Sequence, residues 1–379
     1  MLALALGGGA RRQSARARLK VLFLAFDHIP DFHQDLVCHG LAEVVGPQNV
    51  LVYPQFDRYH EPPPIDVKQT AMSWPKLPRA AEAGLEELAA EADVVVVGAL
   101  RGSALDAFNR IVELGVDKPR AALDGLDDPY YREAIRHVDV YFKRETLARP
   151  LRLRLRFPFR RVVMRYRDHG LWGPDSPLRR QIGVAQLGVQ KLVPLPFAAV
   201  PVEYTKAPAK EYDVGFLGAA THPIRAHVVE AVRDLRAEGL RVLVPDERLS
   251  EDDRYRWESR RTWFDYMRVL SSSRIAISVR GDGFDTYRYW EIPYAGAMLL
   301  SETPRTVIPD NFVDGVEAVF AEPEQLSAEA KRLLESDGVE SIAAAGHLKL
   351  MDKHLSRHRA EVVLERLAAV RRHRAPAGV

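Results

Sequence analysis

The chain has 379 residues, about two and a half times the ~150 residues typical of one domain, so we expect two domains, each with a substantial core. Hydrophobic residues make up 47% and charged residues 28%, a globular composition that excludes a wholly disordered chain. The net charge of +2 excludes a nucleic-acid footprint over the whole surface, although a local basic patch stays open, and we expect no specific nucleic-acid partner. The single cysteine, Cys38, cannot form an internal disulfide, a thiolate zinc site or an iron-sulfur cluster, which favours a reducing cytoplasm.

No stretch approaches the ~18 consecutive apolar residues of a membrane-spanning helix, and the longest apolar runs are strand-sized. At the N-terminus the arginines follow a very short apolar run, whereas a signal peptide has its charges first and a longer core. We therefore expect residues 1–18 to be a disordered tail and the protein to be soluble.

From residue 19 onward, strand-like and helix-like patterns alternate, which is typical of βα units with mostly parallel strands. Apolar spacing predicts helices over 81–92 and 105–114. Short runs rich in valine, leucine and aromatic residues predict strands at Leu19–Phe26, Asn49–Tyr53, Asp93–Val97, Arg120–Leu123 and Val138–Phe142. These elements predict an N-terminal Rossmann-like domain over residues 19–193.

Four prolines without helical spacing predict a linker over residues 194–211. A second βα series predicts a C-terminal Rossmann-like domain over 212–345, followed by C-terminal helices over 346–379, the last a candidate to pack back on the N-terminal domain. In the C-terminal domain we expect one helix that begins near residue 223 and two more at 263–270 and 287–294. The expected strands are 212–217, 240–244, 275–279, 297–300 and 318–320.

A basic insertion spans residues 143–180, which contain twelve Lys or Arg residues and three carboxylates. Apolar residues are interleaved with these charges, so the segment could bind an anionic acceptor or a lipid surface. The alternative is a solvated insertion whose arginines pair with acids elsewhere.

Two segments of the second half carry the strongest chemical signals. In Tyr212–Arg225, a strand runs into a small-residue turn at Gly218 and then a helix that Thr221 can cap, a pattern that suits an anion near Arg225 or serves packing alone. In Ser278–Met298, glycines 281 and 283 let the backbone approach a ligand. Glu291 on the following helix could accept hydrogen bonds from both hydroxyls of a ribose, or could form an ion pair with Arg288 one turn earlier.

The run Gly283-Phe-Asp-Thr-Tyr-Arg-Tyr-Trp-Glu291, followed by Gly296-Ala-Met-Leu-Leu, resembles the nucleotide-binding signature of GT-B glycosyltransferases. The nearest type is the spore-maturation-protein type, related to the group 1 and exostosin-like enzymes. Three further stretches resemble parts of the same family: Tyr212–Arg225, Asp124-Gly-Leu-Asp-Asp-Pro129 and Tyr141-Phe-Lys-Arg-Glu145.

The resemblance implies an α/β protein of two doubly wound Rossmann-like domains facing a cleft, with a nucleoside-diphosphate sugar on the C-terminal domain and no obligatory metal or cofactor. It implies that Glu291 binds the donor ribose and that Gly218, Thr221 and Arg225 lie near the diphosphate. The other donor-site residues that it implies are Arg280, Gly283, Phe284, Asp285, Thr286 and Arg288.

Two positions depart from the family pattern. Asp282 occupies the position of a first glutamate, so the paired glutamates of many group 1 enzymes are not matched. Pro293 lies inside the expected helix and should kink or shorten it.

Asp27 and His28 follow the first strand, where a base could remove a proton from an acceptor hydroxyl, although such a pair could equally be a surface pair. Asp124 and Asp127 are further catalytic candidates, and their alternative is a solvated turn. The predicted function is transfer of a sugar from a nucleoside-diphosphate sugar to a hydroxyl acceptor by a cytoplasmic or peripherally membrane-bound enzyme. The alternatives are a nucleotide-sugar epimerase on the same fold and a non-catalytic nucleotide- or sugar-binding protein.

Overall fold

The computed structural model describes residues 19–26, 31–60, 76–79, 83–127, 131–146, 189–218, 222–244 and 263–374. Several predictions fall outside these described residues: the tail at 1–18, Asp27 and His28, Thr221, and all of the basic insertion after residue 146.

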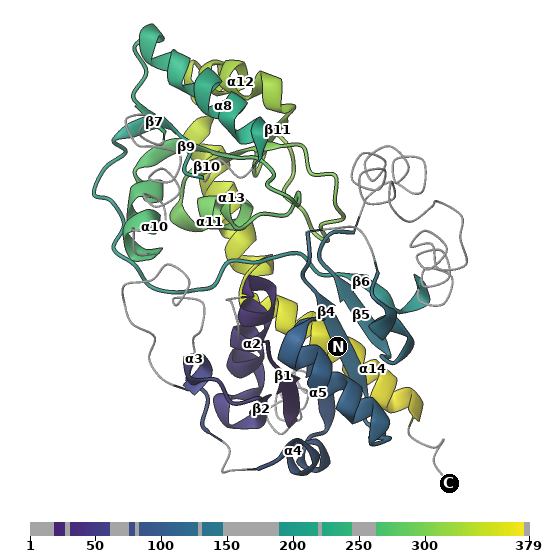
Figure 1. Ribbon diagram of the computed structural model, residues 1–379. Coiled ribbons are helices and arrows are strands. Elements are labelled where there is room, and N and C mark those ends of the chain that lie inside the picture. The colour runs from purple at the N-terminus through teal and green to yellow at the C-terminus, as the bar shows by residue number, and fades with distance from the viewer. Residues whose placement is uncertain are drawn as a thin grey trace, which may run out of the picture.

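The N-terminal half is built on a parallel six-stranded sheet of order β2-β1-β3-β4-β5-β6 (Figure 1). Alternate residues of its strands enter different cores: Val21 and Phe23 pack on one face, and Leu22 and Leu24 on the other. Burial on both faces explains why the strands are almost continuously apolar. The strands are β1 (Val21–Leu24), β2 (Val50–Tyr53), β3 (Val94–Val97), β4 (Arg120–Asp124), β5 (Val140–Lys143) and β6 (Leu192–Pro194).

Helices cover both faces of this sheet. One face is covered by α4 (Leu85–Glu91) and α5 (Gly102–Glu113), and the other by α2 (Phe32–Val45) and α14 (Ser356–Arg374). The helix α2 begins at Asp31, whose side chain accepts a hydrogen bond from the backbone N–H of Gln34. The remaining elements are short: α3 (Asp57–His60) and 3-10 turns at Pro47–Asn49, Glu133–Arg136 and Val189–Lys191.

The C-terminal half has a parallel five-stranded sheet of order β11-β10-β9-β7-β8. Its strands are β7 (Tyr212–Gly215), β8 (Val242–Leu243), β9 (Ser273–Ser278), β10 (Met298–Glu302) and β11 (Val319–Ala321). On one face lie α8 (Pro223–Asp234) and α12 (Leu326–Leu334), and on the other α10 (Trp263–Ser271) and α11 (Tyr287–Ala295). The helix α13 (Val339–Lys353) contributes Val339 to the first core and Leu350 to the second. Two 3-10 turns, Leu235–Glu238 and Pro323–Gln325, complete the described part.

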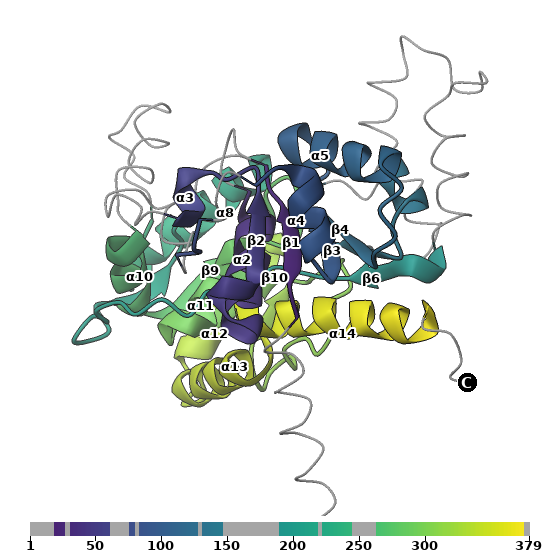
Figure 2. The ribbon, with the colours of Figure 1, turned by 90° about the horizontal axis from the view of Figure 1, so that it is seen from below.

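The chain crosses between the halves twice, once after β6 and once between α13 and α14. The crossings are hydrogen-bonded to each other, since Ala199 N–H donates to His354 O at 3.0 Å and Ser356 N–H donates to Ala199 O at 2.8 Å. From there α14 runs back along the N-terminal half and packs on α2, as Figure 2 shows from below. Gly40 of α2 permits this packing, because a Cβ atom there would meet the backbone carbonyl of Ser356.

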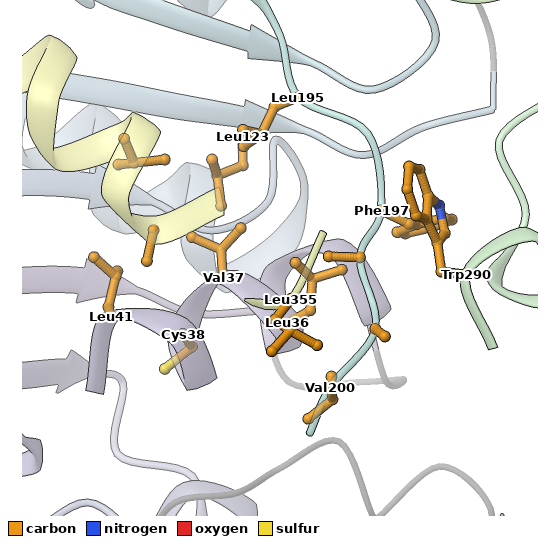
Figure 3. Packing of buried hydrophobic residues seen from close by; sticks show 14 of the residues in the cluster. Leu36, Val37, Cys38, Leu41, Leu123, Leu195, Phe197, Val200, Trp290 and Leu355 are labelled. Atoms are coloured by element: carbon orange, nitrogen blue, oxygen red, sulfur yellow. The ribbon is translucent and has the colours of Figure 1, made fainter. Parts of the chain in front are cut away.

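One hydrophobic cluster runs through both halves and the first crossing. In Figure 3 it extends from Leu36 and Leu41 of α2, past Leu355, to Phe197 and then Trp290 of α11. Arg359 of α14 fastens the same region, because its guanidinium donates to the carbonyls of Pro196 and Phe197. The two halves therefore share a packed core at the crossing.

Candidate functional site

Both glycine-containing segments of the C-terminal half lie at the carboxyl edge of its sheet, the usual place for ligands in open α/β sheets. The strand β7 leads to Gly218, and β9 leads to Arg280 and the loop 281–286. The helix α8 begins after His222, whose Nδ1 accepts from Ile224 N–H at 3.2 Å. The residue that caps the helix is therefore His222, whereas the sequence had suggested Thr221.

Arg288 of α11 lies against Gly218, and a Cβ atom at that glycine would collide with the guanidinium. The side chain is 9% exposed, and its Cζ lies 5.2 Å from the centre of the Phe216 ring. Among the described residues, Nε and Nη1 of Arg288 have no hydrogen-bond partner. A buried guanidinium with unused N–H groups is costly, and an anion at this position would satisfy them.

Two further arginines line the same edge of the sheet. Arg225 Nε donates to the backbone carbonyl of Arg280 at 3.0 Å, and Arg280 forms an ion pair with Glu302 at 3.0 Å. The Arg280 guanidinium also lies over the ring of Phe284, 5.0 Å from its centre. The region is therefore rich in positive charge, with Glu302 as its counter-ion and with the pKa of Glu302 raised by burial.

Glu291 points away from Arg288. Its Oε2 accepts from the Tyr266 hydroxyl at 2.9 Å and its Oε1 accepts from Trp263 Nε1 at 3.3 Å, both on α10. The pair between Glu291 and Arg288 that the sequence left open is not formed. The carboxylate is 6% exposed and borders a small cavity that is also lined by Tyr287, Tyr294 and residues 198–200 of the first crossing.

Pro293 does not shorten the helix, because α11 continues through it to Ala295 and ends at Gly296, which has a left-handed φ of 73°. Thr286 stands at the start of this helix, and its hydroxyl bonds the Ser278 hydroxyl at 3.1 Å. Asp285 faces the protein interior. Its carboxylate accepts from Phe197 N–H at 2.6 Å and from Trp290 Nε1 at 2.8 Å.

On the N-terminal side, Asp124 ends β4 with its carboxylate fully buried. It forms an ion pair with Lys143 Nζ at 3.0 Å and accepts a hydrogen bond from the Tyr141 hydroxyl, which helps raise the Tyr141 pKa after the larger effect of burial. In this arrangement the Asp124 carboxylate is enclosed and paired on two sides, so it does not face an acceptor. Asp127 is half-exposed and pairs with Arg144.

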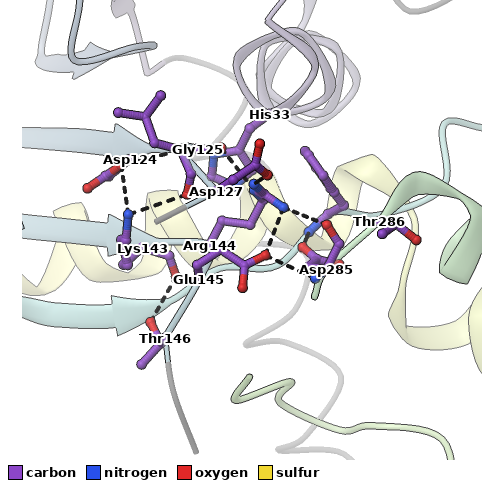
Figure 4. A network of polar contacts seen from close by, with 12 residues as sticks. His33, Asp124, Gly125, Asp127, Lys143, Arg144, Glu145, Thr146, Asp285 and Thr286 are labelled. Carbon is purple, nitrogen blue, oxygen red and sulfur yellow. Dashed lines mark hydrogen bonds and ion pairs between the residues drawn. The ribbon is translucent and has the colours of Figure 1, made fainter. Parts of the chain in front are cut away.

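Arg144 joins the two halves, as Figure 4 shows. It is 1% exposed and donates to Gly125 O at 2.9 Å, to Glu145 Oε1 at 3.0 Å, and to Asp285 O across the interface at 2.5 Å. Sequence reasoning gave Arg144 and Glu145 no individual role. The available signal was three consecutive charged residues, 143–145, at the end of a buried strand, because charges at such a position need partners.

His33 lies beside this network at the start of α2. Its Nε2 bonds the carbonyl of Leu195 at 2.8 Å, and burial followed by the charge of Arg144 lowers its pKa to about 3. The ring is therefore neutral at physiological pH and is 1% exposed, so it packs at the interface and does not meet solvent.

Within the described ranges, no group of three or more His, Cys, Asp or Glu residues is arranged to hold a metal ion. No helix in that part of the chain combines the length and apolar character needed to cross a membrane.

Residues 225–365 match a family model described as glycosyl transferase-like. No curated protein sequence matches the chain. Among solved structures, Alr3699/HepE of Anabaena, determined in complex with UDP and glucose, is 13% identical with a TM-score of 0.54, and the alignment covers 93% of this chain and 100% of that one.

A glycosyltransferase of Rickettsia africae ESF-5 is 8% identical with a TM-score of 0.52, over 93% of this chain and 99% of that one. These likenesses show the fold: two Rossmann-like domains in the GT-B arrangement, as predicted. The chain therefore combines a GT-B fold with a glycosyl transferase-like segment over residues 225–365.

Proposed function

We propose that the protein transfers a glycosyl group from a nucleoside-diphosphate sugar to a hydroxyl acceptor, with the donor held at the carboxyl edge of the C-terminal sheet. The observation that carries this proposal is Arg288, a buried guanidinium whose Nε and Nη1 have no partner among the described residues. It lies against the bare backbone of Gly218, so a diphosphate there would meet both the guanidinium and the turn that precedes α8.

The charge arrangement suits the leaving group of this reaction. When the acceptor oxygen attacks the anomeric carbon, a new carbon–oxygen bond forms and the bond from that carbon to the diphosphate oxygen breaks. Negative charge then grows on the departing diphosphate, and Arg288 with Arg225 and Arg280 would stabilise it. The acceptor proton passes to a base, for which Asp27 and His28 are our candidates.

Glu291 is our candidate for the ribose. Each of its oxygens accepts one described bond, from Tyr266 and from Trp263, and a carboxylate has further lone pairs for two ribose hydroxyls. Gly283, Phe284 and Thr286 belong to the adjoining loop and helix start, where we place the rest of the donor. Asp285 would act through that loop, because its carboxylate is occupied inside the protein.

The test is nucleoside-diphosphate binding by Arg288→Gln, measured by calorimetry with UDP. Hydrogen bonds to a charged group contribute about 1.5–3 kcal/mol each and 1.4 kcal/mol is tenfold in affinity, so we expect the UDP affinity to fall at least about tenfold. Uridine, which lacks phosphate, should bind the variant and the wild type similarly.

The matched control is Arg332→Gln, an exposed arginine of α12 that pairs only locally with Glu329. It should leave UDP binding unchanged. Wild-type affinity in Arg288→Gln, or equal losses for UDP and uridine, would contradict the phosphate assignment.

A second variant tests the ribose assignment. Glu291→Ala should weaken UDP binding by at least about tenfold, whereas 2′-deoxy-UDP, already weak on the wild type, should be little affected by the change. A lower melting temperature with normal UDP affinity would mean that Glu291 only fastens α11 to α10.

Product analysis separates transfer from the alternatives, since an epimerase would release an altered donor and a binding protein would release nothing new. Within the GT-B class we infer the spore-maturation-protein type. This inference is supported by the sequence resemblance of the run Gly283–Glu291 and of the stretch that follows Gly296.

A further inference from the structure

The loop 281–286, which follows β9, is held from the opposite half of the molecule. The backbone N–H of Asp285 donates to Glu145 Oε1 at 3.0 Å, and the backbone carbonyl of Asp285 accepts from Arg144 Nη1 at 2.5 Å. Two consecutive side chains that follow β5 thus satisfy both backbone polar groups of one loop residue (Figure 4).

The glycine of this loop fits the same contact. A Cβ atom at Gly283 would collide with the Glu145 carboxylate and lie 2.8 Å from Asp127 Oδ1. The absence of a side chain at Gly283 therefore lets the loop approach the acids of the N-terminal half, in addition to the approach to a ligand that the sequence predicts.

Asp285 is fixed on its other sides as well. Its carboxylate accepts from the first crossing at Phe197 N–H and from α11 at Trp290 Nε1. The Arg144 guanidinium lies over the Phe197 ring at 4.4 Å, so the loop, the crossing and the N-terminal half meet at one point.

We propose that Arg144 and Glu145 are positioning residues of the donor site: they fix the loop 281–286 in its donor-binding conformation when the two halves are docked. The inference rests on the proposed function. A loop that is already ordered binds its ligand without the entropic cost of ordering it. Loss of the contacts that Arg144 and Glu145 make with the loop, here called the clamp, should therefore lower the donor affinity.

The decisive variants are Glu145→Ala and its neighbour Thr146→Val. Thr146 is also buried and its hydroxyl donates to Lys143 O at 3.1 Å, but its side chain has no described contact with the loop, so it reports the effect of losing a nearby buried hydrogen bond. In the ligand-free protein, we expect hydrogen exchange of the 283–286 amides to accelerate at least tenfold in Glu145→Ala and to stay unchanged in Thr146→Val. UDP affinity should fall at least about fivefold in Glu145→Ala only.

A pH profile gives a readout that a merely structural residue would not change. Burial, with the charges of Asp285 and Asp127, raises the pKa of Glu145 to about 7 although Arg144 opposes the shift. Arg144, Asp285 and Asp127 are the charged groups that face Glu145 from the described part of the chain. Protonation weakens its attraction to Arg144, so the UDP affinity of the wild type should fall between pH 8 and pH 6 relative to that of Glu145→Gln. Because UDP itself titrates equally in both experiments, the comparison isolates Glu145.

The outcomes separate the two proposals. If the wild type binds UDP and Glu145→Ala binds it equally well with unchanged amide exchange, the positioning role is overturned and the donor site stands. Equal loosening of the loop by Thr146→Val would also overturn the positioning role. If the wild type binds no nucleoside diphosphate, the proposed function fails, and the positioning role fails with it even where the exchange data show the clamp.

Discussion

His354, at the junction of α13 and α14, is held in its neutral form, which makes the stability of the second crossing depend on pH. The ring is 1% exposed, Nε2–H donates to Asp310 O at 3.0 Å, and Nδ1 accepts from Arg359 Nη2 at 3.2 Å. Burial and then the Arg359 charge lower the His354 pKa to about 3. A proton on Nδ1 would face a guanidinium, so the folded protein resists protonation.

The size of the effect follows from linkage. The folded pKa lies below the unfolded value of 6.5, so the contribution of His354 to stability is complete above pH 6.5 and is lost as the pH falls toward 3. At pH 5 the unfolded chain has bound the proton and the folded chain has not. The loss in unfolding free energy at pH 5 is therefore about 2 kcal/mol, from ~1.5 pH units at 1.36 kcal/mol each.

The assay is urea unfolding of the wild type and His354→Asn at pH 7.5 and pH 5. We expect the difference in unfolding free energy between the two proteins to be about 2 kcal/mol smaller at pH 5. The difference is the informative quantity because other groups also titrate: His33 shifts in the same direction, and Glu145, with a raised pKa, shifts in the opposite one.

The control is Leu348→Ala on the exposed side of α13, which removes no titratable group and should differ from the wild type equally at both pH values. If the difference between the wild type and His354→Asn is the same at both pH values, the neutral, buried state of His354 is refuted.

Three further predictions follow from the sequence and the fold. Gly40→Ala should lower the unfolding free energy by roughly 2 kcal/mol or more in urea titrations, because the new Cβ meets the Ser356 backbone, and an unchanged midpoint would contradict the close packing of α2 on α14. Asp27→Asn or His28→Ala should reduce turnover ~100- to 10,000-fold with UDP affinity nearly intact, and normal turnover in both would move the base elsewhere, with Asp127 as the next candidate. If the basic insertion binds an anionic acceptor or membrane, its sedimentation with anionic vesicles or acceptor should weaken steeply as salt is added. Binding should also be lost when Arg152, Arg154 and Arg156 are all changed to glutamate. Unchanged binding in that variant would reject the hypothesis.

The sequence was sufficient to predict the α/β architecture, because strands buried on both faces are almost continuously apolar and alternate with amphipathic helices. Short runs such as Val94–Val97 and Ile275–Val279 are typical of strands that are buried on both faces of a parallel sheet. Several elements were missed, among them α3, α12, β6 and α2. The strand β6 is only three residues long and contains Pro194, which an edge strand tolerates, and α2 is apolar on so many sides that its period is weak.

The donor-site candidates came from local patterns: glycines after strands and an acid one helix later are visible without a structure. What those side chains contact could not be predicted. Glu291 and Arg288 are three residues apart on α11, yet one faces α10 and the other faces Gly218, because the surroundings of each helix face are supplied by distant segments.

Only the tertiary structure decided which charged residues are structural and which join the halves. Asp124 was a candidate base, and it is buried and paired with Lys143, whereas Arg144 and Glu145 hold a loop about 140 residues away in sequence. The sequence shows which charged residues lie at the end of a strand or on a helix, but not which residues they contact. The partner of a buried charge is set by how sheets and crossings pack, and that packing depends on contacts between distant parts of the chain.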